Sequence, residues 1–326
     1  MTETGAQYKR VLITGGAGFI GVNFLRLLLS GKLILKADEV VVADSLTYAS
    51  NSGVINSLKE KGQIVFFKGD ISDADFVDSI LPMTDLIINF AAESHVDKSI
   101  ESSNKFISSN VLGVNVLLEG MRKHKVAKFL QVSTDEVYGS IAEGSWDEQH
   151  ELRPNSPYSA SKASGDLLAF AHAKTHGLDI RVTRCSNNYG PFQNIEKFIP
   201  KCITQISSGS AIPVYGKGDQ TREWIYVDDH CRGIDLVIAS GESGNVYNIG
   251  SEFELTNLEM VELLAKKMNC LHPNINHVED RKGHDFRYSL NFEKIKSLGF
   301  YPQVNLETGI RETIDWYLGD QKLISN

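Results

Sequence analysis

The chain has few cysteines and no long hydrophobic run. Its 326 residues include only four cysteines, none of them in a CxxC pair: Cys185, Cys202, Cys231 and Cys270. This scatter argues against a disulfide framework or a zinc site, so we expect no metal, and free thiols in a reducing compartment. No apolar segment approaches the roughly 18 residues that a membrane-spanning helix needs, and residues 1–10 are too polar for a secretory signal. We therefore expect a cytoplasmic protein without a membrane partner.

An excess of basic residues is also absent. The 33 Lys and Arg residues are outnumbered by 41 Asp and Glu residues, which gives a formal net charge of −8. That balance argues against nucleic acid or an anionic membrane surface as a partner, although a few local cations still suffice to bind an anionic ligand. With 42% hydrophobic and 23% charged residues, the composition is that of a folded globular protein. Its length allows a large core divided between two lobes.

Short β-rich runs alternate with longer amphipathic segments in the first half of the chain. The first predicted strand begins with Val11-Leu12-Ile13, and others follow at residues 39–43, 64–67, 86–90, 129–132 and 180–182. Predicted helices lie between them, among them residues 22–30, 104–123 and 156–176. Strands separated by helices are joined by crossovers, which indicates an α/β fold with a doubly wound parallel sheet.

The second part of the chain is less regular, beginning near Arg184. Its clearest signal is the capping box Thr256-Asn257-Leu258-Glu259, which predicts a helix that runs to Met268. We expect this part to form a second, smaller α/β lobe over the carboxyl edge of the sheet. The predicted large domain comprises residues 1–185, to which 222–250 return, and the predicted small domain comprises residues 186–221 and 251–326.

A glycine-rich turn follows the first predicted strand. Residues 14–21 read TGGAGFIG, in which glycines 16, 18 and 21 fit GxGxxG and glycines 15, 18 and 21 fit the looser GxxGxxG. Such a turn lets the backbone approach a pyrophosphate, while the free N–H groups of the next helix face the phosphates. Asp44 ends the second predicted strand 23 residues after Gly21, where a carboxylate binds ribose hydroxyls and repels a 2′-phosphate. The pattern predicts a Rossmann domain that prefers NAD to NADP.

Two groups of polar residues can carry chemistry. Tyr158 and Lys162 are four residues apart on a predicted helix and therefore share one face. The pKa of a free Tyr is about 10, so Tyr is a poor base at neutral pH, and a nearby ammonium would favour its ionised form. Thr134, Asp135 and Glu136 follow the fifth predicted strand, at the edge where doubly wound enzymes place their catalytic groups. A hydroxyl, two carboxyls and a Tyr/Lys pair can together transfer a hydride and expel water.

These features resemble the extended short-chain dehydrogenase/reductase family, which modifies nucleotide sugars. Within it, Thr134-Asp135-Glu136 resembles the signature of the dTDP-glucose 4,6-dehydratases, and the strings at 139–146 and 280–290 look most like their antibiotic-sugar branch. Further matching segments are AAESHVD at 91–97, NNYGP at 187–191, REW at 222–224 and DRKGHD at 280–285. The resemblance, which runs from Gly15 to about Tyr288, implies an NAD-dependent hydro-lyase that converts dTDP-glucose to dTDP-4-keto-6-deoxyglucose.

The resemblance also implies a role for each catalytic residue. Tyr158 would take the proton of the 4-hydroxyl, Thr134 would bond the same oxygen, and Lys162 would hold the nicotinamide ribose. Elimination across C5–C6 needs a base and an acid, and two carboxyls in different environments can divide these roles. In the family mechanism, Glu136 is the base at C5 and Asp135 is the acid at the C6 hydroxyl. The pKa of Asp135 should therefore be raised.

Binding residues are also expected. The predicted cofactor-binding set is Gly15, Gly18, Phe19, Ile20, Gly21, Asp44, Ser45, Leu46, Thr47, Asp70, Ile71, Phe90, Ala91, Ala92, Ser94, Ser109, Tyr158, Lys162 and Asn188. The predicted substrate-binding set is Ser94, Thr134, Asn187, Lys197, Phe198, Pro213, Tyr215, Arg222, Asn257, Arg281 and His284. Arg222 and Arg281 are the candidates for the diphosphate, because a guanidinium binds phosphate in a bidentate manner. In relatives the helices at 104–123 and 156–176 form a four-helix dimer interface, so we expect a homodimer.

Two alternatives differ in chemistry. A 4-epimerase or decarboxylase of a UDP-sugar would need no acidic pair, so Asp135 and Glu136 argue against it; a product assay separates the two activities. A catalytically silent dinucleotide-binding regulator could keep the glycine turn and Asp44, but it has no need of the whole catalytic set. The choice of dTDP over UDP rests on the resemblance alone.

Overall fold

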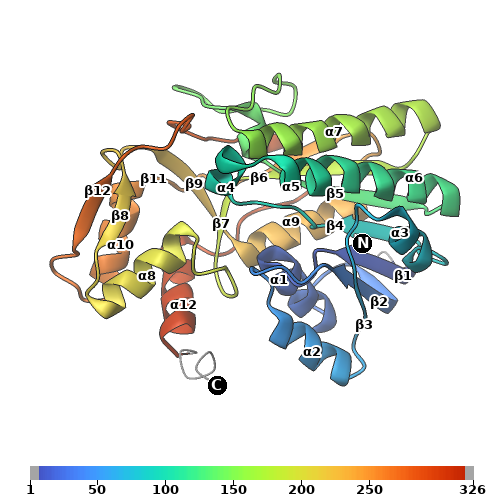
Figure 1. Cartoon of the computed structure of the whole chain (residues 1–326), viewed down its shortest axis with the longest axis horizontal. Helices are drawn as coiled ribbons and strands as arrows, with labels where there is room; N and C mark the ends of the chain where they lie inside the picture. Colours follow the sequence, from blue (N-terminus) through green and yellow to red (C-terminus); the bar gives the residue numbers. More distant parts are fainter. Residues whose placement is uncertain (1–6, 320–326) are drawn as a thin grey trace.

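A seven-stranded parallel sheet forms the centre of the molecule, as the strand and helix pattern predicts. The computed structural model describes residues 7–319 (Figure 1). The strand order is β10-β6-β5-β4-β1-β2-β3, with every neighbour parallel. The strands are β1 (Gln7–Thr14), β2 (Lys36–Asp44), β3 (Val65–Lys68), β4 (Leu86–Asn89), β5 (Lys128–Thr134), β6 (Ile180–Cys185) and β10 (Val246–Ile249). Among residues 7–319, none of the helices combines the length and hydropathy that spanning a bilayer requires.

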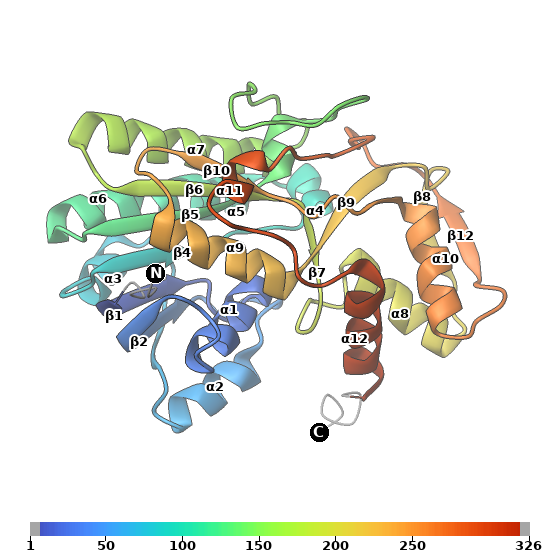
Figure 2. The ribbon, with the colours of Figure 1, turned by 180° about the vertical axis from the view of Figure 1, so that it is seen from behind.

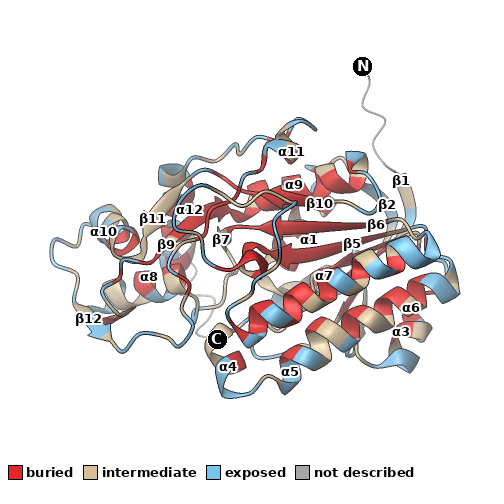
Figure 3. Ribbon diagram, turned by 90° about the horizontal axis from the view of Figure 1, so that it is seen from above, coloured by how far each residue is buried: buried red, intermediate tan, exposed pale blue. Residues whose placement is uncertain are grey.

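Helices cover both faces of this sheet. Successive residues of a strand point to opposite faces, and Val11 and Ile13 of β1 pack into one hydrophobic cluster while Leu12 packs into another. The first cluster lies under α1 (Phe19–Leu29), α2 (Ser52–Glu60) and α9 (Val227–Ser240), seen in Figure 2. The second lies under α3 (Ala74–Ile80), α6 (Val114–His124) and α7 (Pro157–His176). In Figure 3, the central strands are buried while α6 and α7 alternate between buried and exposed positions. This burial on both faces explains the continuous apolar runs of the strands.

The predicted helix at 104–123 is not a single α-helix. It consists of α5 (Asn104–Ile107), a π-helical turn η1 (Ser108–Gly113) and α6. The side chain of Asn110 in the turn accepts a hydrogen bond from the Glu93 N–H (2.9 Å) and donates to the Glu93 carbonyl (3.0 Å) and to Ser161 Oγ (2.8 Å). These contacts hold the turn against α7 and against the segment that follows β4. They offset the energetic cost of the irregular backbone. Such turns are often found at functional sites.

The predicted helix start at 156 is confirmed. Ser156 caps α7 by accepting a hydrogen bond from the Ser159 N–H, Ser159 returns the bond, and Pro157 occupies the first turn. The helix ends at Gly177, whose φ of +64° suits a residue without a side chain. The capping box of Thr256 and Glu259 is also present and begins α10 (Asn257–Lys267).

The smaller lobe lies beyond the carboxyl edge of the large sheet. It contains a sheet of order β11-β9-β7 and a pair of parallel strands, β8 and β12. Its elements are β7 (Asn187–Tyr189), α8 (Phe198–Ser208), β8 (Ile212–Tyr215), β9 (Thr221–Tyr226), β11 (Glu254–Thr256), α10, β12 (Ile275–Val278) and α12 (Leu306–Gly319), packed around one hydrophobic cluster. Between β9 and β11 the chain returns to the large sheet through α9 and β10, and α4 (Val96–Glu101) and α11 (Glu293–Lys296) lie in connections. The predicted boundary at residue 222 assigned β9 to the large domain, but β9 pairs with β7 and β11. We propose that the domains divide near residue 186, with β9 in the smaller one.

Candidate active site

Two adjoining cavities lie at the carboxyl edge of the large sheet. The first, of about 330 Å³, is lined by the glycine turn and by the ends of β2, β4, β5 and β6. The second, of about 640 Å³, is lined mainly by the smaller lobe. Both are lined by Ser94, Glu136, Asn187, Asn188, Gln193 and Lys197. A ligand with two ends could therefore extend from one cavity into the other.

The glycine turn has no room for side chains. A Cβ at Gly15 would lie 2.4 Å from the Ala91 nitrogen, and Gly15 has a φ of +68°, which other residues rarely adopt. A Cβ at Gly21 would lie 2.5 Å from the Gly15 carbonyl oxygen. No side chain caps the start of α1 at Gly18, so the first N–H groups of the helix face the cavity that Gly18, Phe19 and Ile20 line. This cradle fits a pyrophosphate.

Asp44 lies at the tip of β2 and is oriented by the backbone. Its carboxylate accepts hydrogen bonds from the N–H groups of Ala17 (3.0 Å) and Leu46 (2.8 Å). Burial raises the pKa of Asp44, and these two bonds oppose the rise. Ser45 and Thr47 line the cavity with it, but Leu46 does not; its side chain packs against the hydrophobic core. The structure therefore does not bring the Leu46 side chain to the cavity; its N–H holds Asp44 instead.

Replacing Asp44 with Asn should weaken NAD binding by roughly ten- to a hundredfold, since hydrogen bonds to a charged group contribute about 1.5–3 kcal/mol. It should also narrow the preference for NAD over NADP, because the negative charge that repels a 2′-phosphate is lost. Calorimetric titration with both dinucleotides measures these effects. A matched control is Asp73→Asn, since Asp73 also accepts two backbone hydrogen bonds but lies outside both cavities. Unchanged NAD affinity in the Asp44 variant would remove this residue from the site.

The rest of the predicted cofactor set lies around the same cavity. Asp70 and Ile71 come from the end of β3, and Ser109 comes from the π-helical turn. Lys162 is buried, and its ammonium donates a hydrogen bond to the Val132 carbonyl (2.7 Å). The other predicted cofactor residues that line this cavity are Phe90, Ala91, Ala92, Ser94, Tyr158 and Asn188.

Asp135 and Glu136 begin a 3₁₀ turn, η2 (Asp135–Tyr138), directly after β5. Thr134 fixes the start of the turn: its hydroxyl donates to Asp135 Oδ1 (3.1 Å) and accepts from the Glu136 N–H (3.3 Å). Asp135 is only 2% exposed, and within the described residues its Oδ2 is a buried oxygen without a hydrogen-bond partner. Burial, together with the charges of Glu136 and Glu223, raises the pKa of Asp135 well above its ordinary value. This is the raised pKa that an acid at this position needs.

Glu136 lies in a different electrostatic environment. Burial raises its pKa, but the charges of Arg222, Lys197 and Arg281 oppose the rise. The pKa of both carboxyls is raised, but three cations oppose the rise at Glu136. Two neighbouring carboxyls in different environments can serve as an acid and a base.

Tyr158 faces the acidic pair, and its electrostatics differ from the prediction. Burial, followed by the charges of Glu136, Cys185 and Asp135, raises the pKa of Tyr158 well above 10, and a hydrogen bond with Thr134 only partly opposes this. The expected lowering of this pKa by Lys162 is not found in the structure. The reason is that the Lys162 ammonium points to the Val132 carbonyl, while two carboxyls lie near the phenol.

Arg222 and Lys197 are two of the cations that line the second cavity. The Arg222 guanidinium donates to the carbonyls of Thr221 (2.8 Å) and Asp285 (2.8 Å), and it lies over the Tyr288 ring at 4.4 Å. The Lys197 ammonium donates to the Ser94 carbonyl (2.8 Å). Burial lowers the pKa of Lys197, and the charge of Glu136 raises it. These cations suit an anionic ligand.

Arg281 is held by an acidic partner that the sequence analysis did not identify. Its Nε and Nη2 donate to the two carboxylate oxygens of Asp97, at 2.5 and 3.0 Å, and the Tyr215 hydroxyl donates to the same carboxylate at 3.3 Å. Asp97 lies within the quoted AAESHVD segment, but nothing in that string indicates a partner 184 residues away.

The other predicted substrate residues also line the second cavity: Asn187, Phe198, Pro213, Tyr215, Asn257 and His284. Asn257 begins α10 and His284 contacts Asp280 Oδ1 through Nδ1 (2.6 Å), so both also have structural roles. Trp224 and Tyr288 of this cavity, Cys185 of the first and Gln193 of both were not predicted from the sequence. Trp224 could have been found, since it belongs to the quoted REW segment.

Comparison with known proteins identifies the family. Residues 12–313 match the family profile described as GDP-mannose 4,6 dehydratase. The chain belongs to this family. Among its relatives, a dTDP-glucose 4,6-dehydratase of Streptomyces niveus is 49% identical, over 94% of this chain and 92% of the relative. The low-salt glycan biosynthesis protein Agl12 of Haloferax volcanii is 46% identical, over 96% of this chain and 99% of the relative.

Solved structures of similar proteins share the family's architecture. The dTDP-glucose 4,6-dehydratase DesIV from Streptomyces venezuelae, crystallised with NAD, has a TM-score of 0.94 and 48% identity, covering 96% of this chain and 98% of that one. A UDP-glucose 4-epimerase from Thermus thermophilus, also in complex with NAD, has a TM-score of 0.87 and 29% identity, covering 95% and 99%. The fold is thus shared by dehydratases and epimerases, and the residues of the site must distinguish them.

Proposed function

We propose that this protein is an NAD-dependent dTDP-glucose 4,6-dehydratase, a hydro-lyase that forms dTDP-4-keto-6-deoxyglucose. The observation that carries the proposal is the position of the Asp135–Glu136 pair: both carboxyls line the first cavity with Tyr158, and Glu136 also lines the second, where the two cavities meet. The relatives and the DesIV structure, which are named for this activity, support it.

The first cavity suits NAD. Gly15 and Gly21 leave space that any Cβ would fill, the start of α1 offers N–H groups to the pyrophosphate, and Asp44 offers a carboxylate to the adenosine ribose. Lys162 and Tyr158 line the same cavity and would hold the nicotinamide ribose. When bound, NAD⁺ supplies a hydride acceptor for C4 of the hexose and later the hydride that C6 receives.

The catalytic residues move protons in a fixed order. The ionised form of Tyr158, which the positive charge of bound NAD⁺ would favour, accepts the proton of the 4-hydroxyl while Thr134 holds the same oxygen, and the resulting 4-ketone makes the C5 proton acidic. Glu136 removes that proton, and Asp135 donates its own to the departing C6 hydroxyl, which leaves as water. After exchange with solvent, protonated Glu136 returns a proton to C5 as C6 receives the hydride. The raised pKa of Asp135 keeps its proton in place until it is needed.

The second cavity would hold the nucleotide. Arg222 and Arg281 are proposed to bind the diphosphate, with Lys197 and Asn187 holding the sugar and phosphate. Asp97 fixes the Arg281 side chain through Nε and Nη2, which leaves Nη1 for a phosphate oxygen. Phe198, Pro213 and Tyr215 would flank the base.

Isotope transfer and nucleotide preference test the proposed function. With dTDP-glucose labelled with deuterium at C4, we expect the label at C6 of the same molecule, and in D₂O we expect solvent deuterium at C5.

The value of kcat/KM should be roughly tenfold or more higher for dTDP-glucose than for UDP-glucose, since a buried methyl group contributes about that much discrimination. Transfer of the label between molecules, or a 4-epimer as the product, would contradict the proposal.

We further propose a homodimer formed through α6 and α7, in a four-helix bundle. Large apolar side chains on this side of the molecule support it, since Ile107, Leu112 and Leu167 are about half exposed (50%, 48% and 59%).

The expected location is the cytoplasm, where Cys185, Cys202 and Cys231 would stay reduced as the buried free thiols seen here. The product would enter deoxysugar biosynthesis, in line with the antibiotic-sugar resemblance.

A further inference from the structure

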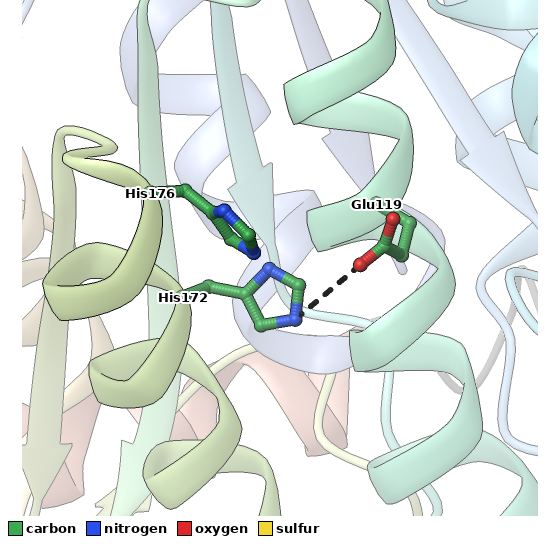
Figure 4. A group of neighbouring side chains, drawn as sticks. All are labelled: Glu119, His172 and His176. Atoms are coloured by element: carbon green, nitrogen blue, oxygen red, sulfur yellow. Dashed lines mark ion pairs between the residues drawn. The ribbon is translucent and has the colours of Figure 1, made fainter.

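Three potential metal ligands meet between α6 and α7. Glu119 of α6 and His172 and His176 of α7 each offer one ligand atom, and these atoms all lie within 4.8 Å of one another. In Figure 4 the His172 ring lies between the other two side chains. None of the three lines either cavity, so the cluster is separate from the candidate active site.

The spacing of the cluster suits a shared ion better than a direct hydrogen bond. His172 Nε2 and Glu119 Oε1 are 3.8 Å apart, which is too far for a hydrogen bond. Two ligands of a tetrahedral zinc ion, each at about 2.0–2.1 Å from the metal, lie roughly 3.3 Å apart, so a small side-chain rotation closes this pair. His172 and His176 are four residues apart on one helix face, which is the sequence spacing of zinc-binding histidines on a helix. Their ring centroids are 5.3 Å apart.

His172 has no hydrogen-bond partner among the described residues. It is only 8% exposed, its Nδ1 is buried without a hydrogen bond, and its Nε2 is 3.8 Å from Glu119 Oε1. A buried imidazole without a hydrogen bond is costly, which favours a ligand at this ring. The second oxygen of Glu119, Oε2, accepts a hydrogen bond from Arg122 (2.7 Å). Arg122 thereby turns Oε1 toward His172, as residues behind a metal ligand commonly do.

We propose that Glu119, His172 and His176 bind a divalent transition-metal ion of the zinc type. Two imidazole nitrogens and one carboxylate oxygen form a donor set that zinc accepts, with the fourth position left for water. In the single chain the Glu119 side chain is 45% exposed, so an ion can reach the cluster before α6 and α7 pair with a second copy. Bound there, it joins α6 to α7 and stabilises the folded chain rather than acting in catalysis.

The test uses the full-length chain without a histidine tag, stripped with a chelator. Calorimetry with Zn²⁺ and absorption spectroscopy with Co²⁺ should each give one equivalent per chain, and saturating Zn²⁺ should raise Tm by about 2–5 °C. His176→Gln and Glu119→Gln should each weaken binding roughly tenfold or more and remove most of the Tm rise. Dehydratase activity should be the same with and without Zn²⁺.

The control is His272→Gln, which removes an exposed histidine outside the cluster, two residues from Cys270. It should leave the affinity unchanged. His176 is exposed, so its variant tests the site even if a change at the buried His172 prevents folding. Less than half an equivalent of bound metal, or binding that survives His176→Gln and Glu119→Gln but is lost in His272→Gln, would overturn the proposal.

Discussion

Glu136→Gln is expected to stop elimination while leaving the first hydride transfer in place. Gln has nearly the same shape as Glu, but its amide cannot accept the C5 proton. General-base catalysis contributes roughly 10²- to 10⁴-fold, so formation of the 4-keto-6-deoxy product should fall by that factor. The C4 oxidation depends on Tyr158, so NADH should form slowly and accumulate on the enzyme.

The decisive measurement follows NADH absorbance and 4-keto product together, in single turnover with dTDP-glucose. Glu148→Gln is a matched control, because burial also raises the pKa of Glu148, yet this residue lines neither cavity and holds the Asn248 N–H (2.9 Å). Its turnover should be unchanged once the folded fraction is taken into account. If Glu136→Gln forms product at the normal rate, another group must remove the C5 proton.

Tyr158→Phe is expected to stop the reaction one step earlier. Without the phenol oxygen, nothing takes the proton of the 4-hydroxyl as the hydride leaves C4, and the rate should fall by about 10²- to 10⁴-fold. No NADH should accumulate, which distinguishes this variant from Glu136→Gln. Substrate affinity should change little, because the cations that bind the diphosphate are untouched.

Stopped-flow absorbance and a substrate titration separate these effects for Tyr158→Phe. Tyr138→Phe is the control: Tyr138 is equally buried, but its hydroxyl donates to Asn248 (2.9 Å) and accepts from Arg184 (2.8 Å), away from both cavities. That variant should lose about 1–3 kcal/mol of stability and keep its rate per folded molecule. NADH accumulation in Tyr158→Phe would show that a different base serves C4.

The glycine turn and the strand-end residues could be predicted because their signals are local. Gly15 and Gly21 are required by backbone clashes within a short stretch of chain and with the adjacent β4 end. The position of Thr134, Asp135 and Glu136 after an apolar run places them at the carboxyl edge of the sheet, where parallel strands bring distant segments together. The i,i+4 spacing of Tyr158 and Lys162 likewise follows from helix geometry.

Where prediction failed, contacts between distant segments decided the outcome. The Lys162 ammonium donates a hydrogen bond to the Val132 carbonyl, and the Leu46 side chain packs toward the core. The residues next to Lys162 and Leu46 in the sequence indicate neither contact. The π-helical turn depends on Asn110 bridging Glu93 and Ser161, which a helical periodicity cannot reveal. Asp97, the partner of Arg281, likewise lies 184 residues away in the sequence, and only the folded structure brings the two together.

By itself, the sequence determined the parallel sheet, the dinucleotide turn and the set of groups able to do chemistry, because each depends on spacing along a single strand, turn or helix. Only the tertiary structure decided the electrostatic environment of the two adjacent carboxyls. Asp135 is fully buried beside Glu223, while Glu136 faces three cations drawn from separate segments. Burial and charge are sums over everything that surrounds a group, so they exist only once the chain has folded.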